Sequence, residues 1–231
     1  AVSELLTGHP ALDHIKVFED PGIHSGFIGF FRLIASLRRE RYDMAFLIQN
    51  AIKAALITTL AGIPERLGYD TDGRGFLLTS SLPKQTAPQH QREAFSQLVS
   101  LLNIPIPKRA PYLALTEEEM GTARTQLASL GISRDDLIVG ICPGTATGSA
   151  KRWIPERFAA VSDQLVKKFQ AKILILGGPK DRPVSETVLH EMKEKAVMLA
   201  GEAQLREMMA LISLCRLCIS NDSGPTHIAA A

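Results

Sequence analysis

The chain has 231 residues, 45% of them hydrophobic and 22% charged, and its formal net charge is +2 at pH 7. This length suits one large or two modest domains with a buried core. The small net charge gives no general case for nucleic-acid binding, which would show as a strongly basic face or stripe. No apolar run reaches the roughly 20 residues of a membrane-spanning helix.

The first half of the chain carries helix and strand patterns of uneven regularity. Apolar periodicity predicts helices over 27–39, 52–61 and 92–102, and apolar runs predict strands over 44–48 and 66–69. Prolines at 105, 107 and 111 then interrupt the chain. Because proline stiffens a linker and blocks both helix and sheet, we predict a domain boundary here, with domains 1–110 and 111–231.

The second half alternates helices and strands regularly. Thr116 and Glu119 have the spacing of a capping box, which predicts a helix start. The predicted elements are helices over 116–130, 155–169, 182–195 and 205–214, and strands over 137–142, 172–176, 196–199 and 216–220. This alternation indicates an α/β fold whose parallel sheet is covered on both faces. Ligands of such sheets bind beyond the carboxyl ends of the strands.

The loop over 143–152 lies at one predicted strand end. It contains two glycines, the hydroxyl groups of Thr145, Thr147 and Ser149, and the cations of Lys151 and Arg152. Backbone amides, hydroxyl groups and a positive charge are what phosphate binding requires. The loop does not match a Walker A motif, and the chain has no G-x-G-x-x-G. A glycine-rich turn with two solvated cations is the alternative interpretation.

A second polar loop, over 221–224, joins the last predicted strand to a helix with His227 in its first turn. Free amides and the helix dipole favour an anion there. Asp222 is either an N-cap or an acceptor for ligand hydroxyl or amide groups. For His227 we favour donation to a phosphate oxygen over a role as general base.

Cys215 and Cys218 form a C-x-x-C motif. The motif lies between a predicted helix end and a buried strand, whereas redox motifs open a helix. A zinc site would need two further ligands, and no second pair has suitable spacing. We therefore interpret these residues as ordinary core cysteines.

Together, several motifs resemble glycosyltransferase family 9, the heptosyltransferases. The motifs are Asp222-Ser223-Gly224-x-x-His227-x-Ala229-Ala230, Pro143-Gly144-x-x-x-Gly148-x-Ala150-Lys151-Arg152-Trp153-x-Pro155, Gln49-Asn50-x-x-Lys53-x-Ala55 and Ala61-Gly62-Ile63-Pro64-x-Arg66-x-Gly68. The resemblance runs through essentially the whole chain. It implies a GT-B architecture of two Rossmann-like parallel-sheet domains, N-terminal for the acceptor and C-terminal for the ADP-sugar donor.

The resemblance also implies an activity. Heptose passes from ADP-heptose to the inner core of lipopolysaccharide with inversion and without a metal or other cofactor. The expected donor-binding residues are Thr147, Lys151, Ala203, Asp222, Ser223, Gly224 and His227, and the expected acceptor-side residues are Asn50, Lys53 and Arg66. Lys151 would neutralise the diphosphate, and the backbone near Ala203 would hold the adenine.

The chain departs from the family pattern in two places. The family opens with a strand, a glycine-rich turn and a helix whose acidic residue is thought to deprotonate the acceptor hydroxyl, and Ala1 follows that unit. We therefore expect both domains to be incomplete, the chain alone to be inactive, and the base to lie upstream of Ala1. Lys180 falls near the position where some relatives have an acidic ribose contact.

Two alternatives remain open at the level of sequence: a non-catalytic nucleotide-sugar-binding module, and a GT-B enzyme with another donor such as a uridine nucleotide. The expected partners are the ADP-sugar and the lipid A–core acceptor, with no nucleic acid. We expect a cytoplasmic location in a Gram-negative bacterium. The lipid-linked acceptor would allow peripheral contact with the inner membrane, although the sequence has no evident amphipathic anchor.

Overall fold

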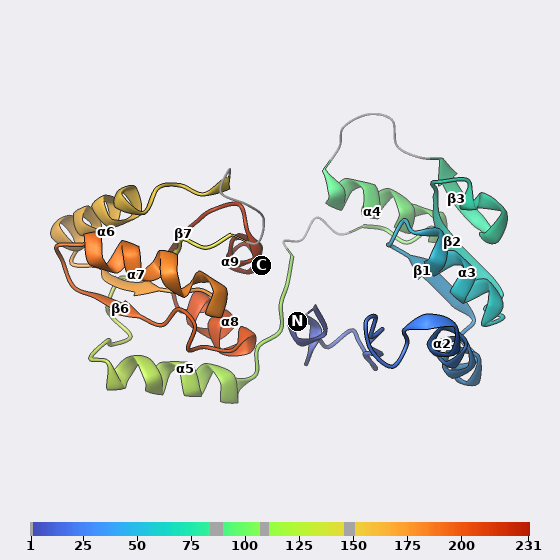
Figure 1. Ribbon diagram of the computed structural model, residues 1–231, viewed down its shortest axis with the longest axis horizontal. Coiled ribbons are helices and arrows are strands. Elements are labelled where there is room, and N and C mark those ends of the chain that lie inside the picture. The colour runs from blue at the N-terminus through green and yellow to red at the C-terminus, as the bar shows by residue number, and fades with distance from the viewer. Residues whose placement is uncertain (1, 84–89, 107–110, 146–150) are drawn as a thin grey trace. The chain divides into compact units, whose positions relative to one another are not determined.

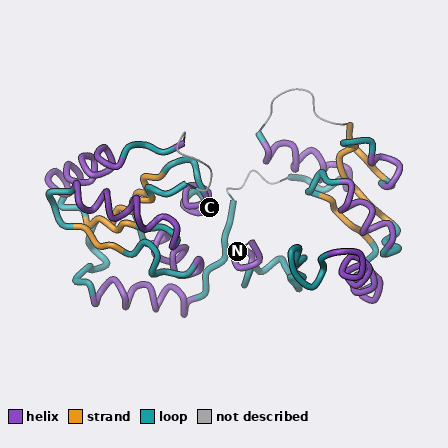
Figure 2. Tube along the Cα trace, in the orientation of Figure 1, coloured by secondary structure: helices purple, strands orange, loops and turns teal. Residues whose placement is uncertain are grey.

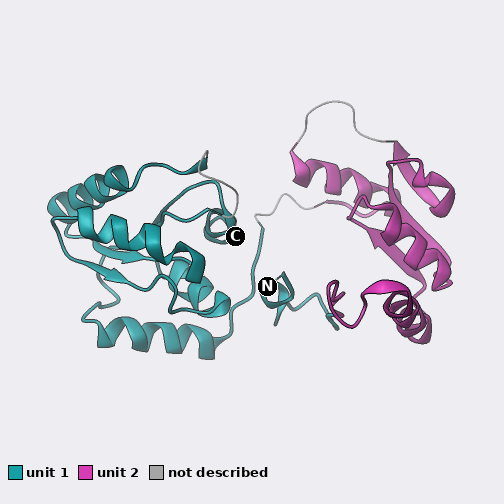
Figure 3. Cartoon of the chain, viewed as in Figure 1, with its two compact units in different colours: residues 1–15, 110–231 teal, residues 16–109 magenta. Residues whose placement is uncertain are grey.

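The computed structural model describes residues 2–83, 90–106, 111–145 and 151–231. The chain forms two compact units (Figure 3): unit 1 comprises Ala1–Ile15 and Ala110–Ala231, and unit 2 comprises Lys16–Arg109. The sequence analysis placed the first fifteen residues with the N-terminal domain, and the structure groups them with unit 1 instead. Helix α1 (Val2–Leu6) lies against α8 (Leu205–Ser213), where Arg206 donates to the carbonyl of Glu4 at 3.2 Å.

Unit 1 is built around a four-stranded parallel sheet of order β6-β5-β4-β7 (Figure 1). Its strands are β4 (Ile138–Cys142), β5 (Lys172–Ile175), β6 (Ala196–Met198) and β7 (Leu217–Ser220). Its helices are α1 (Val2–Leu6), α5 (Glu117–Ser129), α6 (Pro155–Phe169), α7 (Arg182–Glu191), α8 (Leu205–Ser213) and α9 (Gly224–Ala229), with a 3-10 turn η4 over Pro179–Asp181. The predicted parallel α/β architecture is confirmed.

Alternate residues of each strand bury opposite faces of this sheet. Val139 and Ile141 pack with side chains of α6 and α7, whereas Ile138 and Cys142 pack with those of α5 and α8. Figure 2 shows the strands between these helices. Because strand side chains alternate with a period of two, each strand must be apolar on both faces. This is why the strands read as continuous apolar runs in the sequence.

Unit 2 contains a three-stranded parallel sheet of order β1-β2-β3. Its strands are β1 (Met44–Leu47), β2 (Glu65–Asp70) and β3 (Ser80–Pro83), and its helices are α2 (Gly26–Glu40), α3 (Ile52–Leu60) and α4 (Gln91–Val99), with 3-10 turns η1 (Arg74–Leu77) and η2 (Ser100–Leu102). Leu33 and Ile34 of α2 pack against Ile57 of α3. No described helix is long and apolar enough to cross a bilayer.

Most predicted elements agree with the observed ones, but several short elements, α1 and β3 among them, were missed, and a few ends differ. Strand β3 was missed because Ser-Ser-Leu-Pro lacks apolar alternation, and it forms through backbone pairing with β2. Helix α7 ends at Glu191, before the predicted Lys195. The cause is Asp163 of α6, whose buried carboxylate accepts the backbone N–H groups of Lys193 and Glu194 at 2.9–3.1 Å and so ends the helix.

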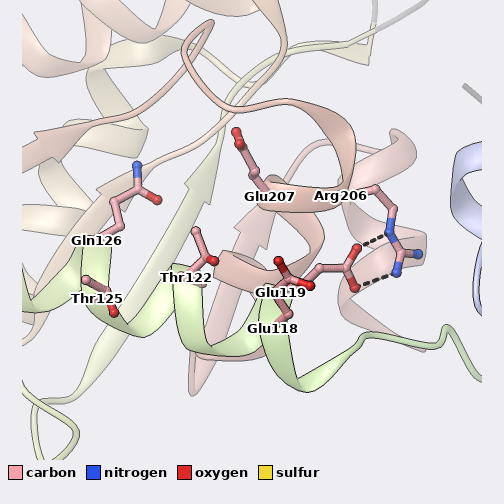
Figure 4. A pocket seen from close by; sticks show the side chains of 8 residues that line it. Glu118, Glu119, Thr122, Thr125, Gln126, Arg206 and Glu207 are labelled. Atoms are coloured by element: carbon pink, nitrogen blue, oxygen red, sulfur yellow. Dashed lines mark hydrogen bonds and ion pairs between the residues drawn. The ribbon is translucent and has the colours of Figure 1, made fainter.

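An ion pair joins α5 to α8 in unit 1. Both oxygens of Glu119 accept hydrogen bonds at 2.7 Å from the guanidinium of Arg206, which also donates to the carbonyl of Ala114 at 2.9 Å. Glu119 meanwhile closes the predicted capping box with Thr116. Figure 4 shows this pair at one end of a groove of about 470 Å³ between the two helices. Because each charge has its counter-ion in a two-bond contact, we interpret the pair as a structural link between α5 and α8.

The ion pair between Glu119 and Arg206 also makes the stability of unit 1 depend on pH. The hydrogen bond from Arg206 is the main cause that lowers the pKa of Glu119 from 4.5 to about 2. A carboxyl group whose pKa falls on folding stabilises the folded state above its unfolded pKa, and this contribution is lost as the pH falls from 4.5 towards 2. We predict that Glu119→Gln lowers the free energy of unfolding at pH 7 by on the order of 2 kcal/mol.

Urea unfolding of the purified chain at pH 7, 4.5 and 2.5 measures this effect. The difference between the wild type and the variant should shrink as the pH falls. A matched substitution is Glu118→Gln, because Glu118 lies in the same helix turn and lines the same groove. An equal loss in both variants would contradict the assignment of the effect to the Glu119–Arg206 pair.

Candidate functional site

The polar loops of unit 1 emerge at the carboxyl edge of its sheet. Strands β4 and β7 are parallel neighbours in a register that pairs Cys142 with Ser220. Pro143 and Asn221, the next residues, therefore leave the sheet side by side. The structure thus brings together the first residues of the two loops in which the sequence analysis placed the donor site, as expected for a ligand-binding edge of a parallel sheet.

Asn221 links these two loops, and the sequence analysis gave it no role. Its side chain is buried, its Nδ2 donates to the carbonyl of Pro143 at 2.7 Å, and its Oδ1 accepts the backbone N–H of Trp153 at 2.9 Å. The sequence feature that could have identified Asn221 is an amide side chain directly after a buried strand. Such a residue needs polar partners because it is shielded from water.

Lys151 and Asp222 face each other above this link. Their Nζ and Oδ2 atoms are 2.5 Å apart, and both side chains are more than half exposed. The hydrogen bond from Lys151 and its charge lower the pKa of Asp222, and the charge of His227 lowers it further. Asp222 is not the N-cap of α9, because Ser223 occupies that position. The role of Asp222 as an acceptor for ligand hydroxyl or amide groups stays a prediction.

The remaining predicted donor residues of this loop lie around the same edge. Ser223 places its hydroxyl 3.3 Å from that of Ser220. Gly224 begins α9 and has open space where a side chain would be. His227 is exposed on the same helix. Lys151, more than half exposed beside Asp222, offers this edge a positive charge for an anion.

A third loop approaches the first from β5. Asp181 accepts the backbone N–H of Gly178 at 3.0 Å, and its side chain lies against Gly144. A Cβ built on Gly144 would lie 2.1 Å from the carboxyl group of Asp181. The close approach explains why glycine follows Pro143. Lys180 is exposed in the same loop.

Ala203 and Thr147 complete the list of predicted donor residues. Ala203 is half-buried and packs against the core cluster that covers one face of the sheet. Two residues earlier, the N–H of Gly201 donates to the carbonyl of Gly177 at 2.9 Å and extends the pairing of β5 with β6. Thr147 lies outside the described residues. Neither position is tested as a ligand contact, and both stay predictions.

The three cysteines lie beneath this edge. The Sγ atoms of Cys142 and Cys218 are 3.9 Å apart. Contact with the Cys218 thiol and burial raise the pKa of Cys142, and burial raises the pKa of Cys215 to about 12. Protonated, buried thiols are poor nucleophiles, which describes Cys142 and Cys215, whereas the hydrogen bond from Cys142 lowers the pKa of Cys218. All three side chains pack in the core cluster on one face of the sheet. Among the described residues no His, Cys, Asp and Glu cluster could hold a metal ion.

In unit 2 the three predicted acceptor-side residues divide between opposite edges of the sheet. Asn50 and Lys53 follow the carboxyl end of β1, where Lys53 pairs with Asp20 at 2.7 Å. Arg66 is the second residue of β2 and donates to the carbonyls of Ile63 and Leu77 at 2.5 and 2.7 Å. Arg66 therefore supports the fold at the amino edge and is not brought together with Asn50 and Lys53.

Arg74 was missed by the sequence analysis. It is completely buried, and its guanidinium donates to the carbonyls of Tyr69, Gln49 and Ala51 and to the side chain of Asn50 at 2.7–3.3 Å. Burial lowers its pKa. A buried arginine with this many acceptors fixes the backbone that follows β1 and β2, and with it the position of Asn50.

Comparison with known proteins gives consistent matches. The profile of Glycosyltransferase family 9 (heptosyltransferase) matches residues 30–231. Lipooligosaccharide heptosyltransferase 2 of Haemophilus influenzae is 36% identical over 94% of the chain, and lipopolysaccharide heptosyltransferase 2 of Salmonella typhimurium is 32% identical over 87%. The chain spans only 65% and 60% of the lengths of these two proteins.

Two solved structures are also similar. The crystal structure of the glycosyl transferase family 9 from Veillonella parvula has a TM-score of 0.80 at 23% identity, over 89% of the chain and 60% of that protein. The E. coli ADP-heptose lps heptosyltransferase II has a TM-score of 0.69 at 28% identity, over 87% of the chain and 63% of that protein. These likenesses confirm the predicted GT-B class of fold.

The contact of Gly144 with Asp181 makes a testable prediction. Gly144→Ala should destabilise unit 1 by about 1–3 kcal/mol, because the short Asp181 side chain cannot move far enough to admit a methyl group. Gly178→Ala is the control, since its added carbon would lie 3.8 Å from Asp181. Thermal unfolding of the purified variants measures both. Equal Tm values for Gly144→Ala and the wild type would contradict the close approach.

Proposed function

Because the chain belongs to glycosyltransferase family 9, the heptosyltransferases, we propose that the complete protein transfers heptose from ADP-heptose to the inner core of lipopolysaccharide. The observation that carries the proposal is the junction of two polar loops at the carboxyl edge of the unit 1 sheet, with Lys151 facing Asp222. Unit 1 would bind the ADP-sugar, and unit 2 would bind the acceptor.

The charge on these loops suits the leaving group of the reaction. In the transfer, an acceptor oxygen bonds to the anomeric carbon while the bond from that carbon to the diphosphate oxygen breaks. Attack from the face opposite the leaving group inverts the anomeric centre. Negative charge then grows on the departing ADP, and a positioned cation stabilises it. Lys151 would supply this cation, so the proposed transfer needs no metal ion or other cofactor.

The other donor residues have supporting roles in this proposal. Ser223 and Gly224 would contact the sugar and the phosphates, His227 would donate to a phosphate oxygen, and Thr147 would add a hydroxyl. Asp222 would exchange its contact with Lys151 for sugar hydroxyl groups once the phosphates engage the lysine. The backbone near Ala203 would hold the adenine. No residue of this chain is assigned as the base that deprotonates the acceptor.

On the acceptor side, Asn50 and Lys53 are the better supported of the three candidates, because they follow the carboxyl end of β1. Lys53 keeps about half of its side chain exposed while it pairs with Asp20. Arg66 has its guanidinium engaged by backbone carbonyls at the other edge, which supports a structural role for it.

Helix α2 supports a peripheral contact with an anionic membrane surface. Phe27 and Ile28 are 80% and 76% exposed, and Phe31 lines a shallow hollow with Arg39 and Arg41. Exposed apolar side chains in the first half of α2 and arginines in its last turn would suit the acyl boundary and the phosphate groups of an anionic bilayer. The proposed location is therefore the cytoplasmic face of the inner membrane of a Gram-negative bacterium, where a lipid-linked acceptor would be met.

Two other functions make different predictions. A non-catalytic nucleotide-sugar-binding module would bind ADP-heptose in its complete form without transfer to a core acceptor. A GT-B enzyme with a uridine donor would bind UDP more tightly than ADP. Transfer assays and calorimetry with both nucleotides therefore separate the three functions.

The role of Lys151 can be measured directly. In the complete protein, Lys151→Gln should weaken ADP binding by about 10- to 100-fold, the value of a hydrogen bond to a charged group, and should slow heptose transfer. Lys167→Gln is the control, because Lys167 is a similarly exposed lysine on α6. Calorimetric titration with ADP and UDP measures the affinities. Unchanged ADP binding and transfer in Lys151→Gln would remove this residue from the proposed site.

Vesicle binding tests the membrane contact of the complete protein. Phe27→Ser with Ile28→Ser should reduce sedimentation with vesicles of mixed zwitterionic and anionic phospholipid by about tenfold. Phe76→Ser is the control, because Phe76 is 79% exposed in the same unit but lies on η1. Equal binding by both variants, or wild-type binding without preference for anionic vesicles, would contradict the contact.

A further inference from the structure

The segment that carries Lys151 is fixed at both sides by one side chain. Asn221 donates to the carbonyl of Pro143, before this segment, and accepts from the N–H of Trp153, two residues after Lys151. The two distances are 2.7 and 2.9 Å, and only 6% of Asn221 is exposed. The amide of Asn221 therefore determines where the two ends of this loop lie.

The backbone of Asn221 is held as firmly as its side chain. Its carbonyl oxygen accepts the hydroxyl groups of Ser220, Ser223 and Thr226 at 2.9, 3.2 and 2.6 Å. The next residue along the chain is Asp222, the partner of Lys151. The backbone of Asn221 is thus part of the loop over 221–224, while its side chain binds both ends of the segment that carries Lys151.

From this geometry we propose that Asn221 is a positioning residue for the donor diphosphate. It holds the segment of Lys151 at a fixed distance from that of Asp222 and Ser223, so that both segments contact the same ligand. The inference rests on the proposed function of this edge and goes beyond it, because Asn221 is buried and would act through the segments of Lys151 and Asp222.

Few side chains can replace this amide. Asparagine offers an NH2 donor group and a carbonyl acceptor at the same reach. Aspartate keeps the acceptor but places a carboxylate oxygen against the carbonyl of Pro143 unless it is protonated, and leucine leaves both partners without a hydrogen bond. An unsatisfied buried polar group costs about 1–3 kcal/mol. A change at Asn221 therefore affects stability as well as position, and the test must separate the two.

Asp163 provides the matched control. It is 7% exposed, lies in the same unit, and likewise ties two backbone N–H groups, those of Lys193 and Glu194, to its own helix. These groups follow α7 and precede β6, at the amino edge of the sheet. Asp163→Asn should thus lower Tm without a change in ligand affinity.

The experiment measures the affinities of the complete protein for ADP and adenosine by calorimetry, below the Tm of every variant. Asn221→Asp should weaken ADP binding at least tenfold at pH 8 and leave adenosine binding unchanged, because only the diphosphate contacts move. Relative to the wild type at each pH, ADP affinity should recover towards pH 5. Burial raises the pKa of the introduced carboxyl, and its protonated form can again donate to Pro143.

Thr226→Val is the second variant and decides the outcome if Asn221→Asp does not fold. It removes one hydroxyl from the carbonyl of Asn221 and should weaken ADP binding several-fold, again without an effect on adenosine. Equal ADP affinity of the wild type and the folded variants, or an equal loss for ADP and adenosine, would overturn the positioning role. Failure of the wild type to bind ADP would instead overturn the proposed function, and the inference with it.

Discussion

The hydrogen bonds of the Asn221 side chain are the interaction on which the candidate site depends. The parallel pairing of β4 with β7 brings two strand ends together, but strands alone leave the loops beyond them free to diverge. One buried amide closes that gap by joining Pro143 to Trp153. The contact of Lys151 with Asp222 then follows, because both residues are within two positions of an anchored backbone.

The sheet of unit 1 has an apolar core, whereas the loops at its carboxyl edge carry charged side chains. Burial and contact with neighbouring thiols raise the pKa values of Cys142 and Cys215, and both side chains pack in the apolar core under this edge. Lys151 places a positive charge at this edge, with its side chain more than half exposed. Because this cation lies on the surface, it avoids the free-energy cost of burying a charge and stays available to an incoming anion.

Much of this architecture could be predicted from the sequence because it rests on local patterns. The periodicity of α6 and the capping box of Thr116 involve residues that are neighbours in the chain, and both are confirmed. Asn221 and Asp163 were missed because their partners lie 30 to 78 positions away. The acceptor-side role of Arg66 came from motif resemblance alone, and strand pairing places this residue at the amino edge of its sheet.

The central claim is that the loops joined by Asn221 form one binding site for the diphosphate of the donor. Amide chemical shifts of the complete protein titrated with ADP test it most directly. The account predicts the largest shifts at Lys151, Trp153 and the residues that follow Asn221, with little change along α5 and α8. Shifts concentrated in the groove beside Glu119 and Arg206, with none at the two loops, would contradict it.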